Sequence, residues 1–146
     1  MVTLSDATHT EVVHARGHEN VTATHESTFE LTTDEFLTPA GDCILGIEAD
    51  RAPAAFDEAF IAACRDPTAE IMAVLEVDGR TTRVTASGAS GLSLTSDRSL
   101  VVRTSDYVDA RTVAVGATAA AADIDRGIVD ALAAGAELTL TLGISP

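Results

Sequence analysis

Lysine and tryptophan are both absent from this chain of 146 residues, and aromatic residues make up only 3% of it. Ala, Val, Ile and Leu must therefore fill the interior, and the length suits a single domain, 1–146, with a buried core. No apolar run approaches the roughly 18 residues that a transmembrane helix needs. The opening MVTLSDATHTEVV lacks the basic start and apolar stretch of a secretory signal. We therefore expect a cytoplasmic protein with no membrane segment.

Basic residues are scarce, because nine arginines face 23 acidic residues and the net charge is −14. An acidic chain without lysine and rich in Asp, Ala and Thr resembles proteins of salt-loving archaea. At about 1 M salt the Debye length is roughly 3 Å, so crowded carboxylates repel one another little. The sequence has no basic stripe, which argues against a nucleic-acid partner. The charge therefore indicates a halophilic protein with an acidic surface.

Cysteine is also rare, with only Cys43 and Cys64, and no C-x-x-C spacing joins them. In a reducing cytoplasm we expect both to be free thiols. Phe56, Phe60 and Cys64 recur at the spacing of one helical face, which places Cys64 in the core.

Hydrophobic patterning predicts short strands separated by turns and two helices. Asp78-Gly79 between two alternating runs is a strong hairpin signal. Residues 1–10 are polar and are expected to be loose. The expected strands cover 11–16, 20–24, 27–32, 43–49, 70–77, 80–87 and 137–144, and the expected helices cover 53–65 and 119–133.

The chain also repeats itself. When residues 44–66 are set above 113–134, Phe56 meets Ile124 and Cys64 meets Leu132. The two halves, about 11–77 and 81–145, then share the order of strands, loop, strand, helix and strand. We therefore predict an α+β fold: a single β-rich domain of two pseudo-two-fold-related halves, mostly antiparallel, with two helices.

The repeat separates packing residues from candidate functional residues. A position that is apolar in both halves serves packing, whereas a reactive side chain in only one half is a better candidate for function. The unusual residues gather in the first half. In this alignment Cys43 lies against Thr112, Asp42 against Arg111 and His25 near Asp97, TTD at 32–34 meets TSD at 104–106, and His18 falls near the GASG loop at 88–91.

Three of the four histidines lie close together, at His14, His18 and His25. Two histidines with a cysteine or aspartate could form a zinc or iron site. The spacing of these histidines matches no tight ligand signature, and hydrogen-bonded strand residues are the alternative. Cys43 could be a thiol nucleophile, or a half-buried cysteine that closes a loop, because Asp42 beside it disfavours a thiolate.

A longer pattern runs from Gly17 to Asp50. It reads Gly-His-x-Asn, then His-x-x-Thr-Phe-Glu-x-Thr, then Leu-Thr-x-x-Gly-Asp-Cys-Ile-x-Gly. This pattern resembles the signature region of the archaeal "domain of unknown function 371" family, with Ala40 where that family usually has a basic residue. The resemblance implies no reaction, but it groups the candidate site residues His18, Asn20, His25, Glu30, Asp42 and Cys43, with His18 and His25 as candidate metal ligands.

Three functional hypotheses follow. The polar site could bind a metal, with Zn or Fe as the candidates, or a small molecule without chemistry. It could instead be a small-molecule hydrolase that uses His18, His25, Asp42 and Cys43. The third hypothesis is a non-catalytic assembly or RNA-associated factor. The sequence does not predict an oligomeric state.

Overall fold

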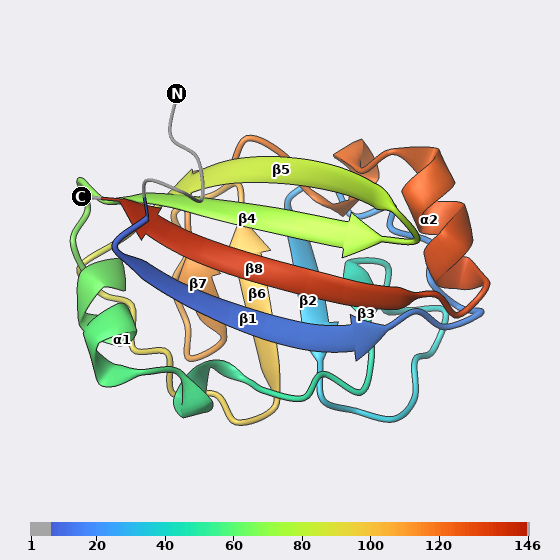
Figure 1. Cartoon of the computed structure of the whole chain (residues 1–146), viewed down its shortest axis with the longest axis horizontal. Helices are drawn as coiled ribbons and strands as arrows, with labels where there is room; N and C mark the ends of the chain where they lie inside the picture. Colours follow the sequence, from blue (N-terminus) through green and yellow to red (C-terminus); the bar gives the residue numbers. More distant parts are fainter. Residues whose placement is uncertain (1–6, 146) are drawn as a thin grey trace.

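Two four-stranded β-sheets form the body of the protein in a computed structural model that describes residues 7–145 (Figure 1). The first sheet is antiparallel throughout, in the order β1-β8-β4-β5. The second has the order β3-β2-β6-β7, with an antiparallel centre and parallel outer pairs. The strands are β1 (His9–Arg16), β2 (Thr28–Thr32), β3 (Ile44–Gly46), β4 (Glu70–Val77), β5 (Arg80–Ser87), β6 (Ser99–Arg103), β7 (Thr112–Ala114) and β8 (Glu137–Ser145).

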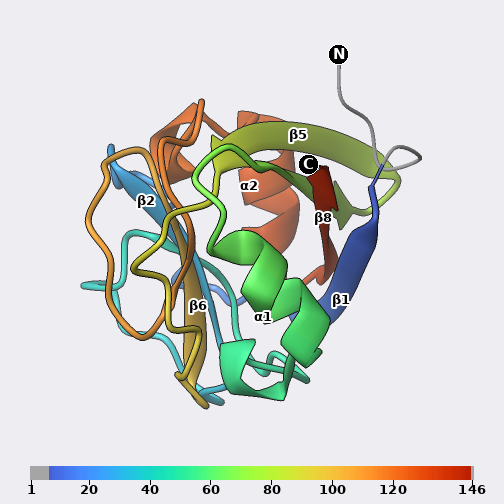
Figure 2. The ribbon, with the colours of Figure 1, turned by 90° about the vertical axis from the view of Figure 1, so that its left-hand side faces the viewer.

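The sheets face each other with their strands crossing steeply, and one helix lies at each open end (Figures 1 and 2). Helix α1 (Glu58–Cys64) contacts β1 and β8, whereas α2 (Arg126–Ala133) contacts β3 and β4. Apolar side chains from both sheets and both helices fill the space between. The largest fully buried side chains of this core include Phe29, Phe60, Leu75, Leu100, Leu132 and Leu138. The predicted α+β class, mostly antiparallel with two helices, is confirmed.

Both helices are shorter than predicted, because an aspartate interrupts each expected segment. Short 3-10 turns, η2 (Pro53–Ala55) and η3 (Ala121–Asp123), precede α1 and α2. Asp57 and Asp125 follow in extended conformations, and their carboxylates accept the backbone N–H groups of Ala59 and Ile128. An N-cap starts a new helix rather than continuing one, so the predicted continuous helices 53–65 and 119–133 are wrong.

The two halves repeat their backbone hydrogen bonds. The Glu30 N–H donates to the carbonyl of Cys43 at 2.9 Å, and the Val101 N–H donates to that of Arg111 at the same distance. Equivalent positions differ by 71 residues in the first two strands of each half. From β3 and β7 up to the helices they differ by 68, because the loop 33–43 is three residues longer than the loop 104–111. Cys43 therefore corresponds to Arg111 rather than Thr112.

That register corrects three further equivalences. His25 matches Ser96 rather than Asp97, Asp42 matches Ala110 rather than Arg111, and TTD at 32–34 matches RTS at 103–105, one residue before TSD. His18 matches Ala89, within the GASG loop as expected.

Two local predictions also differ from the structure. The segment 20–24 is a loop, in which buried Ala23 has a φ of +49°, and Leu94 repeats this conformation with a φ of +50°. A left-handed residue cannot continue a strand ladder, which is why the alternation at 20–24 misled. The expected loose segment 1–10 lies partly outside the described residues, and His9 and Thr10 within it belong to β1.

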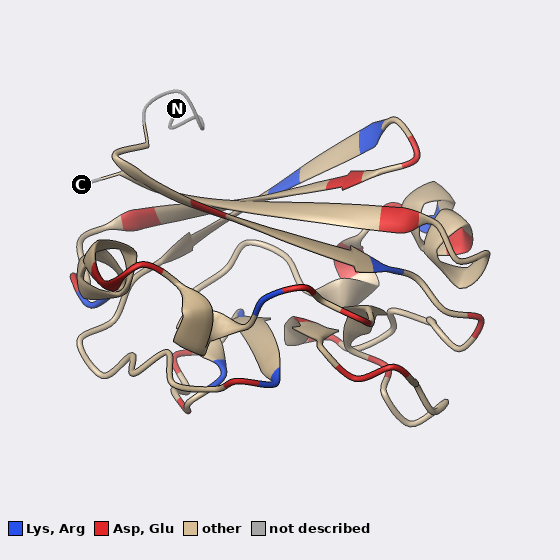
Figure 3. Ribbon diagram, turned by 60° about the horizontal axis from the view of Figure 1, so that its bottom comes forward, with Lys and Arg blue, Asp and Glu red and all other residues tan. Residues whose placement is uncertain are grey.

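Asp and Glu positions are scattered over strands, helices and loops, with the arginines interspersed among them (Figure 3). Within residues 7–145, no helix has the length and apolar character needed to cross a bilayer.

Candidate functional site

The six predicted site residues lie on β2 and on two loops, 17–27 and 33–43, that lie against each other. The carbonyl of Asp42 joins these loops, because it accepts the backbone N–H groups of Thr24 at 3.0 Å and His25 at 3.2 Å. The structure brings the side chains together in pairs rather than as one constellation.

His25 stabilises a turn. Its Nδ1 accepts the backbone N–H groups of Ser27 at 3.2 Å and Thr28 at 3.1 Å, just before β2 begins. In the second half the Ser96 hydroxyl accepts the N–H groups of Arg98 and Ser99 in the same way, each at 3.2 Å. Because Ser96 makes the same contacts at the equivalent position, these hydrogen bonds serve the fold in both halves.

His18 and Asn20 also serve their own loop. The backbone N–H of Asn20 donates to His18 Nδ1 at 3.0 Å, and the Asn20 side chain donates to the carbonyl of Leu37 at 2.7 Å. The second contact ties the loop 17–27 to the loop 33–43. Both histidines that sequence reasoning favoured as metal ligands therefore use Nδ1 as an acceptor for backbone groups.

Cys43 and Glu30 form a direct pair, with the thiol donating to Glu30 Oε1 at 3.5 Å. Burial, together with the negative charges of Glu30 and Asp42, raises the pKa of Cys43 to about 11. The thiol therefore stays protonated at neutral pH, which is the opposite of what a nucleophilic cysteine needs. Cys64 is fully buried, as expected, and burial raises its pKa to about 12.

Among residues 7–145, no three His, Cys, Asp or Glu side chains are grouped closely enough to hold a metal ion. The predicted cluster of His18 and His25 with Asp42 or Cys43 is therefore not assembled in this structure.

Glu30 instead opens onto a cleft of about 290 Å³, which we call the arginine cleft. Its other lining residues come from both halves and are mostly charged or hydroxyl-bearing. They are Thr32, Asp34, Ile44, Ser96, Arg98, Ser99 and Arg111.

Arg98 is held at one side of the arginine cleft by a two-pronged ion pair. Its Nε and Nη2 donate to the Asp34 carboxylate at 3.0 and 2.7 Å. These hydrogen bonds hold the pKa of Asp34 below its usual value. The fork geometry fixes the orientation of the Arg98 guanidinium.

Arg111 is held by a chain of charges on the outer side of the second sheet. It lies 3.5 Å from Glu30 and 3.2 Å from Asp109, and Asp109 also pairs with Arg103 at 3.0 Å. Burial raises the pKa of Asp109, but hydrogen bonds from Thr112 and Arg111 and the charge of Arg103 outweigh it, and the pKa falls to about 2. Arg111 is thus anchored without being buried.

Sequence reasoning missed Arg98, Arg111 and the hydroxyl of Ser96, because all three lie in the half that looked bland. One signal was present: with the correct register, Arg111 stands where the first half has Cys43. An alignment shifted by one residue at that point concealed the exchange of a thiol for a guanidinium.

Comparison with known proteins relates this chain to sequences of unknown activity, one of which is archaeal. A family model described as "domain of unknown function (DUF371)" matches residues 13–145. An uncharacterised protein of Methanocaldococcus jannaschii is 39% identical over 127 residues, which cover 87% of this chain and 93% of that relative. The chain therefore belongs to the domain of unknown function 371 family.

Proposed function

We propose that this protein is a non-catalytic binding module whose arginine cleft takes a small molecule with a carboxylate or phosphate group. One observation carries the proposal: Arg98 and Arg111 line the same cleft, together with the hydroxyl groups of Thr32, Ser96 and Ser99. Guanidinium groups match the geometry of carboxylate and phosphate oxygens, and hydroxyl groups add further donors.

The ion pairs around the cleft support this proposal. Asp34 and Asp109 orient the two guanidinium groups, yet the Arg98 and Arg111 side chains remain 65% and 44% exposed. Arginines that are already oriented lose less entropy when a ligand binds. Glu30 lies at the same cleft and disfavours a second negative charge near Arg111, so a ligand with one anionic end fits best.

The other hypotheses have less support. A hydrolase that uses Cys43 would need a lowered pKa, and the pKa of this thiol is raised. His25 Nδ1 accepts two backbone N–H groups, so this nitrogen is not free to take a proton from a substrate. No observation on the described residues favours an RNA-associated or assembly role.

Calorimetric titration with inorganic phosphate and with succinate tests the proposal. We expect the Arg98→Gln/Arg111→Gln double variant to weaken binding of the preferred probe by at least about tenfold. The matched control is Arg83→Gln, which removes an exposed arginine of β5 outside the cleft. Equal binding by the double variant and the control, or no binding of either probe by the native chain, would refute the proposal.

The charge of −14 leads to a separate proposal, that the chain works in the molar salt of a halophilic archaeal cytoplasm. Near 0.1 M KCl the Debye length lengthens to about 10 Å, so carboxylates repel one another over a longer range. We therefore expect the thermal unfolding midpoint to fall when KCl is diluted from about 2 M to about 0.1 M. Circular dichroism measures the midpoint, and an unchanged value would contradict the proposal.

A further inference from the structure

The start of α2 contains a binding site for a guanidinium group, which the protein fills with its own Arg126. This guanidinium donates to backbone carbonyls of the loop 17–27, of η3 and of Ile124, which follows η3, at 2.9–3.3 Å. We call this set of carbonyls the filled cradle. Its members are Thr22, Ala23, Ala121, Ala122 and Ile124.

The first helix has the same backbone surroundings. The Ala54 N–H donates to the carbonyl of Ser96, just as the Ala122 N–H donates to that of His25, each at 2.9 Å. Leu94 repeats the left-handed conformation of Ala23. The carbonyls that correspond to the filled cradle are therefore those of Ser93, Leu94, Pro53, Ala54 and Phe56.

The residue that corresponds to Arg126 is Glu58, so this second set has no guanidinium of its own. We call the carbonyls of Ser93, Leu94, Ala54 and Phe56 the open cradle. Within the described part of the chain, these four carbonyl oxygens accept no hydrogen bond. A negative side chain thus stands where the other half has a positive one.

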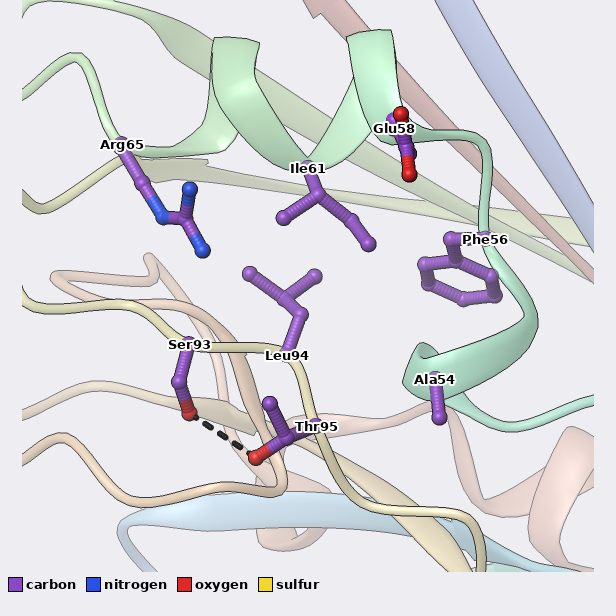
Figure 4. Close-up of a pocket in the computed structure, with 8 residues that line it drawn as sticks. All are labelled: Ala54, Phe56, Glu58, Ile61, Arg65, Ser93, Leu94 and Thr95. Carbon is purple, nitrogen blue, oxygen red and sulfur yellow. Dashed lines mark hydrogen bonds between the residues drawn. The ribbon is translucent and has the colours of Figure 1, made fainter.

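A cavity of about 520 Å³ occupies this place. All four residues of the open cradle line it, and Glu58 projects toward it from the start of α1 (Figure 4). Ile61 and Leu94 point toward each other across its middle, and the Phe56 ring lies near Glu58 (Figure 4). The cavity therefore combines unpaired carbonyls with a carboxylate at one end and apolar side chains in its middle.

Arg65 defines the opposite end of the cavity (Figure 4). Its Nε donates to the carbonyl of Leu92 at 2.8 Å, which holds the guanidinium in place. Arg51 also lies nearby, over the Phe56 ring, but it is paired with the buried carboxylate of Glu11. Glu58 and Arg65 are seven residues apart, which corresponds to about 10 Å along a helix.

We propose that this cavity binds a small zwitterion that carries a guanidinium group. The guanidinium of the ligand occupies the open cradle beside Glu58, as Arg126 occupies the filled cradle. Its alkyl chain lies along Ile61 and Leu94, and its carboxylate pairs with Arg65. The internal copy supplies the argument, because the same backbone arrangement already holds a guanidinium in this molecule.

Calorimetric titration with three probes of similar shape tests the ligand chemistry. L-Arginine has both charged ends, agmatine lacks the carboxylate, and citrulline replaces the guanidinium with a neutral ureido group. We expect L-arginine to bind most tightly, agmatine more weakly, and citrulline at least about tenfold more weakly than L-arginine. Equal affinity for citrulline and L-arginine, or no binding of L-arginine, would overturn the proposal.

Two variants of Glu58 test the location. Glu58→Arg places a guanidinium in the open cradle, so the chain should fill its own site and lose L-arginine binding. Glu58→Gln keeps the shape and removes the charge, and it should weaken binding by about tenfold. Asp130→Arg is the matched control, because it makes the same charge change at an exposed position of α2 and should bind as the native chain does. Unchanged L-arginine binding by both Glu58 variants would place the ligand elsewhere.

Discussion

The two halves of the molecule make the same backbone contacts with different side chains. His25 and Ser96 accept equivalent pairs of backbone N–H groups. At the start of the helices, by contrast, Arg126 binds carbonyls whereas Glu58 faces a cavity. Where the side chain differs between the halves but the contact is the same, the position is explained by folding. Where the contact is lost, as at Glu58, the position is a better candidate for binding.

The halves also depend on each other, because the first strand of each half ends against the helix of the other. Gly17 follows β1 and lies against the backbone of Leu132 at the end of α2. Gly88 follows β5 and lies against the backbone of Cys64 and Asp66 at the end of α1. Neither half therefore completes its packing alone, which fits one cooperative domain.

The largest expected effect comes from disrupting the packing of each first strand against the helix of the other half. Gly17→Ala and Gly88→Ala would each place a methyl group into backbone carbonyl oxygens, which cannot move aside as a flexible side chain can. We expect each variant to lower the free energy of unfolding by about 3 kcal/mol or more. Urea denaturation in molar KCl measures it. A Cβ atom added at Gly91 would lie 3.9 Å from its nearest neighbour, so Gly91→Ala should change the free energy of unfolding little. Comparable losses in all three variants would contradict the packing of each first strand against the other half's helix.

The second prediction compares the turn caps. His25→Ala and Ser96→Ala each leave two backbone N–H groups without an acceptor. Each should lower the free energy of unfolding by about 1–2 kcal/mol. His25→Ser, which copies the second half, should recover part of that loss. If His25→Ala left the unfolding free energy unchanged, the structural role assigned to His25 would be wrong.

The third prediction concerns acid. Asp109 has no carboxylate counterpart, because Gly41 stands at the equivalent position. Its pKa of about 2 in the folded chain lies below that of an unfolded aspartate, so its contribution is present above about pH 4 and is lost as pH falls toward 2. Allowing for solvent screening, we expect that contribution to be about 1 kcal/mol.

Comparing the native chain with Asp109→Asn isolates this contribution from the other carboxylates. The variant should be less stable at pH 6, and the difference in unfolding free energy should shrink between about pH 4 and pH 2. Chemical denaturation at each pH measures that difference. A difference that is independent of pH would show that the ion pairs of Asp109 with Arg103 and Arg111 do not stabilise the fold.

Sequence patterns predicted the fold class because they report burial, and burial is what the strands and helices share. The Asp78-Gly79 hairpin and the apolar faces of α1 and α2 lie where the patterns placed them. The break at Asp57 and the loop at 20–24 were missed because a cap and a left-handed residue are decided by backbone hydrogen bonds, which periodicity does not encode.

The candidate site was harder to predict for a different reason. His25 looks like a ligand in sequence because histidine carries chemistry, yet its contacts repeat those of a serine. Arg98 and Arg111 look like ordinary surface charges, and they become a site only when the second sheet brings them to one cleft with Glu30. The register between distant strands determines whether these side chains line one cleft. The loop 33–43 is three residues longer than its copy 104–111, and this difference concealed the register.

The smallest expected effect concerns a hydrogen bond from a backbone N–H to a side chain that both halves make. The first half adds a charged pair to this bond. Asp50 accepts the backbone N–H of His14 at 2.8 Å, and Thr118 accepts that of Thr85 at 3.2 Å. Asp50 also pairs with the His14 ring at 3.2 Å, but both side chains are at least half exposed. We expect Asp50→Ala and Thr118→Ala each to cost about 0.5–1 kcal/mol of unfolding free energy.

The His14 ring should add only a few tenths of a kcal/mol, roughly the value of an exposed ion pair. A double-mutant cycle of His14→Ala and Asp50→Ala at about pH 5, where imidazole side chains are protonated, measures this addition. It should shrink further as KCl rises and screens the pair. A coupling well above about 1 kcal/mol would contradict this assignment. It would then mark the His14–Asp50 pair, rather than the shared backbone bond, as the feature that distinguishes this edge of the first half from its copy.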